Sequence, residues 1–272
     1  MIRTVLLFGG RSAEHEVSIL SARSVANAAP KQRIEPIAIC IAKDGRFIAP
    51  ERSAKILDGS EKSGFGDEQF SFETWVRSTK PDIVFPLIHG TGGEDGTVQG
   101  YLETIGVPYV GAGVAASAIG MDKAHMKHAF AAMKLPMVEY VQVLETDWKN
   151  ERDRIVRAIN NALRLPYFVK PANSGSSVGV TKVKTDGDLG AAGYARVDFF
   201  LERGTSRVVV NEINTIPGFT NISMYPKLWE ATEIKYSHLI EKLIDLGLHR
   251  WRAREARRDS AMKWFEEVKA LT

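Results

Sequence analysis

The chain has 272 residues, of which 44% are hydrophobic and 25% charged, and its formal net charge is +3 at pH 7. This ordinary globular composition excludes an intrinsically disordered chain, and the length allows a substantial core and more than one domain. The small net charge does not indicate a nucleic-acid partner; the basic run 249–258 has two interpretations, a nucleic-acid-binding arm or a solvated helix, of which we favour the helix.

The single cysteine and the lengths of the apolar runs bear on location. Cys40 lies in the apolar run 37–41, where we expect a reduced thiol buried as a small hydrophobe and no disulfide framework. No apolar stretch reaches transmembrane length. The apolar run within residues 1–10 is too short for a secretory signal, because it ends at two glycines. We therefore expect a cytoplasmic protein with no membrane and no nucleic-acid partner.

The first third alternates apolar strands with helical patterns, which predicts an α/β layer with a mainly parallel sheet. The expected strands are 3–8, 35–41, 46–48, 82–88 and 108–111. A helix should follow Gly10, with Val17, Leu20 and Val25 near helical spacing, and another should cover 97–105.

The remaining elements are predicted from capping residues and apolar runs. Asp122 is a plausible N-cap for a helix that follows it. Beyond it we expect strands 138–144 and 166–170, a helix over 150–163, a Ser/Gly loop over 173–179, two strands joined by a hairpin at 202–205, and helices 234–246 and 262–271.

The two late strands carry a candidate metal site. Because side chains alternate along a strand, Arg196 and Asp198 share one face, and so do Glu212 and Asn214. If the strands are neighbours, three oxygen ligands and one cation converge. Such hard ligands suit Mg²⁺ or Mn²⁺, which substrate phosphates usually complete. The alternative is that these are polar residues at a sheet edge that face water.

Five motifs occur in the order found in one enzyme family. They are Gly-Gly-Arg-Ser-Ala-Glu-His-Glu-Val-Ser at 9–18, His-Gly-Thr-Gly-Gly-Glu-Asp-Gly-Thr-Val-Gln-Gly at 89–100, Met-Asp-Lys at 121–123, Val-Lys-Pro at 169–171 with Gly-Ser-Ser-Val-Gly at 175–179, and the run 212–226. Each motif alone is common. Together they closely resemble the D-alanine–D-alanine ligases, ATP-grasp enzymes of peptidoglycan precursor synthesis.

The resemblance implies a fold and a reaction. The fold is α/β, with an N-terminal Rossmann-like (pre-ATP-grasp) substrate-binding domain over 1–118, a partial central ATP-grasp domain over 119–189 and a C-terminal metal and substrate domain over 190–272. The reaction is the ATP-dependent ligation of two D-alanines through an acyl phosphate. The implied cofactors are ATP and two Mg²⁺ or Mn²⁺ ions, and the implied assembly is a homodimer.

The resemblance also assigns roles at the phosphate end. Asp198, Glu212 and Asn214 match the metal ligands, and Arg196 matches an arginine beside the transferred phosphoryl group. Lys123 and Lys170 match phosphate-contacting lysines, while Ser174 and Ser177 belong to a loop that closes over the triphosphate. On residues alone, Lys170 also fits a surface lysine, and the loop also fits a flexible linker.

At the amino-acid end the resemblance places Glu14 on the ammonium group of the first D-alanine, with Ser176 hydrogen-bonded to it. His89 matches a substrate-side histidine, although a histidine at a strand end is more often structural. The residues implied for the second amino acid are Gly218, Ser223 and Met224. Taken alone, Pro217 and Gly218 also fit a simple turn.

The spacing departs from the family at one place. Only 20 positions separate Ser176 from Arg196, so roughly eighty residues of the family pattern are absent, too many for a loop deletion. Leu189-Gly190 is the expected seam, the point at which the two retained parts of the family pattern are joined. The lost section includes the adenine site and the mobile loop that keeps water from the acyl phosphate, so we expect little or no ligase activity.

Two other functions are considered. The chain could be a non-catalytic remnant that serves as a binding or dimerising module. A nicotinamide dehydrogenase is disfavoured, because the first strand is not followed by Gly-x-Gly-x-x-Gly and the second does not end in an acidic residue.

Overall fold

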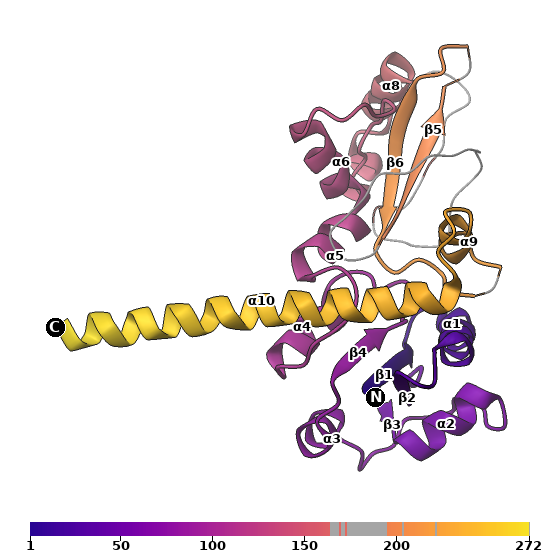
Figure 1. The fold of residues 1–272 in the computed structure, drawn as a ribbon. Coiled ribbons are helices and arrows are strands. Elements are labelled where there is room, and N and C mark those ends of the chain that lie inside the picture. The colour runs from indigo at the N-terminus through magenta and orange to yellow at the C-terminus, as the bar shows by residue number, and fades with distance from the viewer. Residues whose placement is uncertain (164–168, 170–171, 173–194, 203, 221, 272) are drawn as a thin grey trace.

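The computed structural model describes residues 1–163, 169, 172, 195–202, 204–220 and 222–271, and Figure 1 shows their course. A four-stranded sheet has the order β3-β2-β1-β4, and a two-stranded sheet is formed by β5 and β6. The strands of the first sheet are β1 (Ile2–Gly9), β2 (Ile34–Ile41), β3 (Phe47–Ile48) and β4 (Ile83–Pro86). β1 pairs in parallel with β2 and β4, and only β3 is antiparallel. The Rossmann-like, mainly parallel sheet is thereby confirmed.

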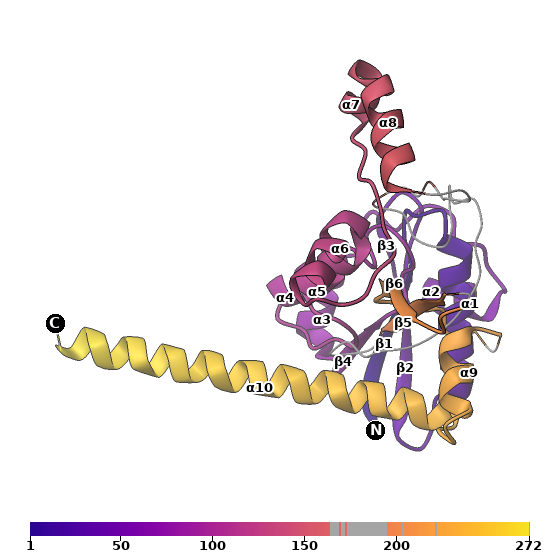
Figure 2. The same ribbon diagram turned by 90° about the horizontal axis from the view of Figure 1, so that it is seen from above.

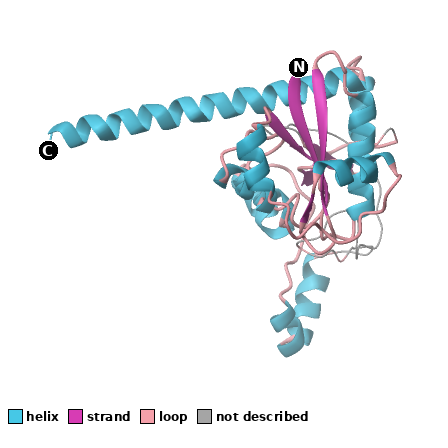
Figure 3. Ribbon diagram, turned by 90° about the horizontal axis from the view of Figure 1, so that it is seen from below, coloured by secondary structure: helices cyan, strands magenta, loops and turns pink. Residues whose placement is uncertain are grey.

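Helices cover both faces of this sheet (Figure 3). Leu6 and Phe8 share a core with α1 (His15–Ala28) and α2 (Pro50–Asp58). Val5 and Leu7 point the other way, into a core formed with α3 (Phe72–Thr79) and α4 (Thr97–Thr104). Successive residues of β1 thus alternate between two apolar layers, which explains why the strand is hydrophobic throughout.

The apolar stripe predicted for α1 is confirmed at Val25, which is 1% exposed, and is wrong at Val17 and Leu20. Val17 and Leu20 are 44% and 50% exposed, whereas Ser18 and Ser21 are fully buried. The Ser18 hydroxyl accepts from the Gly9 N–H (2.7 Å) and donates to the Leu87 carbonyl (2.6 Å). Because Ser18 satisfies backbone groups where β1 and β4 end, α1 buries serines on the same inward side as Ile19, Ala22 and Val25.

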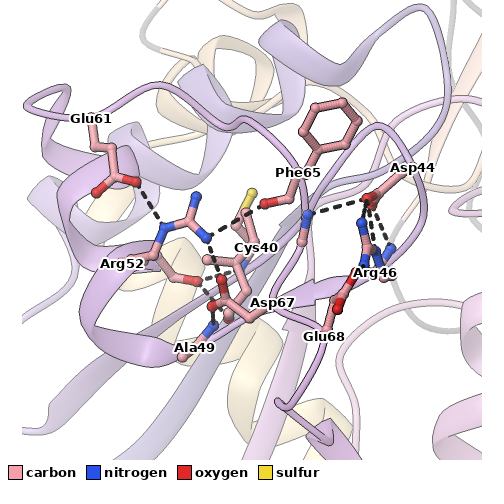
Figure 4. A network of polar contacts seen from close by, with 12 residues as sticks. Cys40, Asp44, Arg46, Ala49, Arg52, Glu61, Phe65, Asp67 and Glu68 are labelled. Carbon is pink, nitrogen blue, oxygen red and sulfur yellow. Dashed lines mark hydrogen bonds and ion pairs between the residues drawn. The ribbon is translucent and has the colours of Figure 1, made fainter.

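Ion pairs hold the loop that follows α2 against α2 itself and against the turn before β3 (Figure 4). Arg52 contacts Glu61 at 2.8 Å and also Asp67, and Arg46 contacts Glu68 at 2.9 Å. Exposed pairs contribute little individually, but several of them together fix one loop geometry. The same loop delivers the Ser63 hydroxyl to His15 Nε2 at 2.6 Å, so it braces the start of α1.

The middle of the chain contains α5 (Val114–Met121), α6 (Lys123–Ala132), α7 (Glu145–Asn150) and α8 (Arg152–Ala162), of which α7 and α8 stand out from the body (Figure 2). The Asp122 cap is confirmed, because its carboxylate accepts from the N–H groups of Ala124 (2.9 Å) and His125 (3.0 Å).

Two predicted strands in this part of the chain are wrong. Residues 138–144 form no strand, and only the preceding Met137 makes an isolated bridge, to Val210. Residues 108–111 likewise contribute one bridge, between Tyr109 and Val84. An apolar run becomes a strand only where a neighbouring strand offers a ladder, and among the described residues each of these segments has only its single bridge.

The C-terminal part comprises β5 (Arg196–Leu201), β6 (Val208–Asn214), α9 (Met224–Glu230) and α10 (Tyr236–Leu271). Helices were predicted over 234–246 and 262–271, with the basic run between them as a solvated helix. In the structure α10 joins these segments in one helix of 36 residues, whose second half extends beyond the body (Figure 1). Its first turns bury Leu239, Ile240 and Leu243 in the core of β1. The basic run lies within α10, as the helical interpretation predicted. In the described part of the chain, no helix combines the length and apolarity needed to cross a bilayer.

Candidate functional site

The β5–β6 ladder brings the four residues of the expected metal site together. Arg196 is the register partner of Asn214, and Asp198 is the partner of Glu212. Partners in an antiparallel ladder point to the same face, as do positions two apart on one strand. All four side chains therefore lie on one face. The register skips Asn211, so β6 bulges directly beside Glu212, a device that re-aims side chains next to functional sites.

The opposite face of this hairpin fixes it to α6. Val197 and Phe199 of β5 form a small core with Phe130 of α6. This contact also brings the first residue of α6, Lys123, to the edge of the polar face, with its Nζ 4.0 Å from Glu212 Oε2. The polar face thus has one cation on β5 and a second supplied by a helix.

Charge on this face is balanced by direct contact. Arg196 donates two hydrogen bonds to Asp198, from Nε to Oδ1 at 2.7 Å and from a terminal nitrogen to Oδ2 at 2.9 Å. These bonds raise the pKa of Arg196. The negative charges of Asp198, Glu212 and Glu94 raise it further, while burial lowers it. Two carboxylates directly opposed across a ladder repel each other, and Arg196 and Lys123 supply positive charge that offsets this repulsion.

The amide of Asn214 also points to a cation. Its Oδ1 is buried and accepts no hydrogen bond from any described residue. A buried acceptor without a donor is costly unless a positive group completes it. Among the residues described, no three His, Cys, Asp or Glu side chains gather, so the set amounts to two carboxylates and one amide. Those oxygen donors fit a hard divalent ion.

The N-terminal half of the site forms where β1 and β4 end. The Ser12 hydroxyl accepts from the Glu14 N–H (3.2 Å) and donates to the His89 carbonyl (2.6 Å). Glu14 is 8% exposed, and it lies so close to Gly90 that a Cβ added there would be 2.6 Å from Glu14 Oε2. A carboxylate is therefore held at the carboxyl end of a parallel sheet, where ligands of such folds bind.

His89 connects this half to the segment after β6. Its Nδ1 lies 3.0 Å from the Ile216 carbonyl, which can only accept, so Nδ1 carries the hydrogen. Its Nε2 is hydrogen-bonded to the Ser21 hydroxyl, 2.8 Å away. Both ring nitrogens contact protein groups, an arrangement in line with the structural alternative for this histidine.

Of the residues implied for the second amino acid, Gly218 and Ser223 lie on the loop between β6 and α9, and Met224 is the first residue of α9. A Cβ on Gly218 would be 2.8 Å from the Ser223 hydroxyl, which accepts from the Thr220 N–H at 3.0 Å. Met224 is 54% exposed. Phe219 has no exposed surface, and its ring meets the Phe85 ring edge-on, with the ring centroids 5.5 Å apart. This loop is therefore anchored in the core of the N-terminal sheet.

Two residues escaped the sequence reasoning. The Ser21 hydroxyl accepts from the Phe219 N–H at 3.3 Å while it bonds His89. Glu94, 7% exposed, lies 3.8 Å from His89 Nδ1, and its charge also acts on Arg196. The position of Glu94 inside the motif 89–100 was the available signal for it, whereas nothing in the sequence marked Ser21.

Four expected residues cannot be placed. Lys170, Ser174, Ser176 and Ser177 lie outside the described residues. Their roles stay predictions from the sequence.

Comparisons with known proteins agree with this architecture. The family model for the D-ala D-ala ligase N-terminus matches residues 3–112. The model for the D-ala D-ala ligase C-terminus matches in two segments, 129–192 and 187–245, which meet at the predicted seam.

Individual relatives match along nearly their whole length. The D-alanine–D-alanine ligase of Halothermothrix orenii is 35% identical over 342 residues, covering 91% of this chain and 98% of the relative. That of Natranaerobius thermophilus is 32% identical over 366 residues, covering 98% and 99%. The structure of the D-alanine-D-alanine ligase from Coxiella burnetii superposes with a TM-score of 0.79 at 29% identity, covering 96% of this chain and 99% of that one.

The alignments locate the difference between this chain and its relatives. A match over 342 or 366 residues is longer than the 272 residues available here, so the relatives carry internal residues that this chain lacks. The two segments of the C-terminal model place that lack within the ATP-grasp part. The motifs, the fold and the matched spans together show that this chain belongs to the D-alanine–D-alanine ligase family.

Proposed function

We propose that this chain joins two D-alanines in an ATP-dependent reaction through an acyl phosphate, for peptidoglycan precursor synthesis, at a turnover well below that of full-length relatives. Its relatives are named for this reaction, and the family uses ATP and a divalent metal ion. One observation carries the proposal: Arg196, Asp198, Glu212 and Asn214 converge on one face of the β5–β6 pair, beside Lys123.

In this proposal the polar face binds the ATP phosphates. Asp198, Glu212 and Asn214 hold Mg²⁺ or Mn²⁺, two ions when fully loaded, which neutralise phosphate charge. Arg196 provides a planar guanidinium beside the charge that develops on transfer. Lys123, with 17% of its side chain exposed, adds a second cation. Lys170, Ser174 and Ser177 are assigned to the phosphates from the sequence alone.

The amino acids bind where the sheet ends. Glu14 pairs with the ammonium group of the first D-alanine, and its burial strengthens that ion pair because little water screens it. Ser176 hydrogen-bonds Glu14, and His89 holds the substrate side of the site. Gly218, Ser223 and Met224 receive the second D-alanine, the serine through its hydroxyl and backbone donors.

Low turnover follows from the absence of the internal residues that the full-length relatives carry. An acyl phosphate survives only if water is kept away until the amine attacks. The residues that the relatives carry and this chain lacks fall in the ATP-grasp part. We propose that water reaches the intermediate here, so that hydrolysis competes with ligation. We further propose a cytoplasmic homodimer, with D-alanine and ATP as its small-molecule partners.

The test is phosphate release in the presence of ATP, Mg²⁺ and D-alanine, with L-alanine and the Asp198→Asn variant as controls. We expect release that requires D-alanine and falls at least about tenfold in the variant, because a metal ligand is lost. Release that is the same with D-alanine, L-alanine or neither would refute the proposal.

A second candidate, a non-catalytic binding module, is favoured by the alignment lengths alone. It predicts that ATP with Mg²⁺ or D-alanine raises the melting temperature, since ligands stabilise the state that they bind, while no phosphate is released. Stabilisation without D-alanine-dependent release would select this candidate over the ligase.

A further inference from the structure

The Arg196 guanidinium occupies both oxygens of the Asp198 carboxylate. The two contacts, 2.7 Å and 2.9 Å, form the planar fork in which arginine matches a carboxylate bidentately. A divalent ion bound to Asp198 needs oxygen lone pairs from the same carboxylate. The fork and the ion therefore compete for one group.

The surroundings strengthen this competition, because a divalent ion on Asp198 would have to share the carboxylate with the guanidinium, a second positive group. Asp198 faces Glu212 directly across the ladder, and these like charges repel unless a cation lies near them. Lys123 reaches only to 4.0 Å from Glu212, a looser contact than the fork. Both partners of the fork are also largely shielded, with side-chain exposures of 25% and 30%, so water screens it less than a surface pair.

We propose that Arg196 is a built-in competitor of the divalent ion: it holds Asp198 while the site lacks metal, and it must release Asp198 when metal binds. This inference rests on the proposed function, because it assigns Asp198 to the metal. Metal loading then has a second effect, which is to free the guanidinium for the transferred phosphoryl group. One exchange thereby sets both the metal and the arginine for reaction, and an arginine still on Asp198 marks a site that is not loaded.

Under competition, the observed metal affinity equals the intrinsic affinity multiplied by the fraction of molecules in which Arg196 does not hold Asp198. A charge-assisted, bidentate hydrogen bond is typically strong enough to change an equilibrium about tenfold or more. Coupling is also reciprocal, so metal must weaken the fork by the same factor by which the fork weakens metal binding.

The test compares Mn²⁺ binding, measured by the electron paramagnetic resonance signal of the free ion, in wild type, Arg196→Ala, Arg196→Lys and Arg207→Ala. Arg207 is exposed at the turn end of the same hairpin and serves as the control for loss of a positive charge. We expect Arg196→Ala to bind Mn²⁺ about tenfold more tightly than wild type and Arg207→Ala to bind as wild type does.

Arg196→Lys separates the fork from simple charge. Lysine keeps the charge but cannot form a planar two-point contact, so competition predicts an affinity close to that of Arg196→Ala. An affinity equal to wild type in Arg196→Lys, or in both Arg196 variants, would overturn the inference while leaving the proposed function intact. If neither the wild type nor any variant binds Mn²⁺, the metal assignment fails and the inference fails with it.

A second measurement does not depend on the variants folding. In wild-type protein labelled with ¹⁵N arginine, the Nε–H resonance of Arg196 should shift as Mg²⁺ is added, because its hydrogen bond to Asp198 is lost. A resonance that stays in place while Mg²⁺ binding is seen by melting temperature would contradict the exchange.

Discussion

Glu14 lies directly against Gly90: a Cβ on Gly90 would be 2.6 Å from Glu14 Oε2. The loop that begins at His89 thus sets the position of the carboxylate proposed to bind the first D-alanine. The glycine also has φ of +73°, a conformation that side chains other than glycine rarely adopt.

Gly90→Ala should weaken the response to D-alanine. The new methyl group must displace the Glu14 carboxylate, so more D-alanine should be needed for half-maximal phosphate release or stabilisation. Gly106→Ala is the matched control, because Gly106 has the same φ of +73° but no atom within 4 Å of its Cβ position. We expect both variants to lose about 1 kcal/mol of stability from strain, and a normal D-alanine response in Gly90→Ala would contradict the assignment of Glu14.

Glu212→Gln should separate stability from metal binding. The substitution removes the repulsion between directly opposed carboxylates, so the melting temperature in EDTA should stay level or rise, by an amount equivalent to about 0.2–1 kcal/mol. Stabilisation by Mn²⁺ should be largely lost. Glu202→Gln, at the exposed hairpin turn, should change neither quantity; undiminished Mn²⁺ stabilisation in Glu212→Gln would remove Glu212 from the site.

Phe219→Ala should destabilise the whole N-terminal sheet, although Phe219 follows β6 in sequence. Its ring has no exposed surface and contacts Phe85, Tyr225 and Tyr236. Truncation of such a side chain costs about 3–5 kcal/mol. Phe65→Ala, at a residue 76% exposed, should cost no more than about 0.5 kcal/mol in the same urea titration. Equal effects would show that the loop is not anchored as described.

Asp122→Ala should destabilise α6 by about 1 kcal/mol, because its carboxylate caps the helix that begins at Lys123. Its hydrogen bonds, first that from the His125 N–H, hold the pKa of Asp122 below 3.8. A lowered pKa gives stability that is present above the unfolded value and lost as pH falls through the folded value. The difference between wild type and variant in urea should therefore be full at pH 7 and shrink below pH 3.8; a difference that does not depend on pH would contradict this source.

Periodicity revealed most of the elements that a local pattern can specify. The strands of the parallel sheet, the Asp122 cap and the shared face of Arg196 and Asp198 follow from alternation and capping, which are local. The inward face of α1 did not, since Ser18 and Ser21 are buried only because strand-end backbone groups and His89 need their hydroxyls. Such partners, far away in sequence, are invisible to a helical period.

The same limit applies to the site. Register with β6 cannot be read from β5 alone, yet it decides that Asp198 opposes Glu212 rather than a neighbour. Glu94 and Ser21 form hydrogen bonds with residues more than a hundred positions away: the Glu94 carbonyl accepts from the Thr215 hydroxyl, and the Ser21 hydroxyl accepts from the Phe219 N–H. The helical interpretation of the basic run was right, but the local pattern could not show that Arg250 contacts Tyr109, its Cζ 4.4 Å from the ring centre.

The most direct measurement of the central claim is the ratio of D-alanyl-D-alanine formed to phosphate released, with ATP, Mg²⁺ and D-alanine at saturation. We predict phosphate release that depends on D-alanine and a ratio well below one, because water intercepts the acyl phosphate. A ratio of one at a turnover within about tenfold of a full-length relative, a difference of 1.4 kcal/mol in barrier, or phosphate release that ignores D-alanine, would contradict the account.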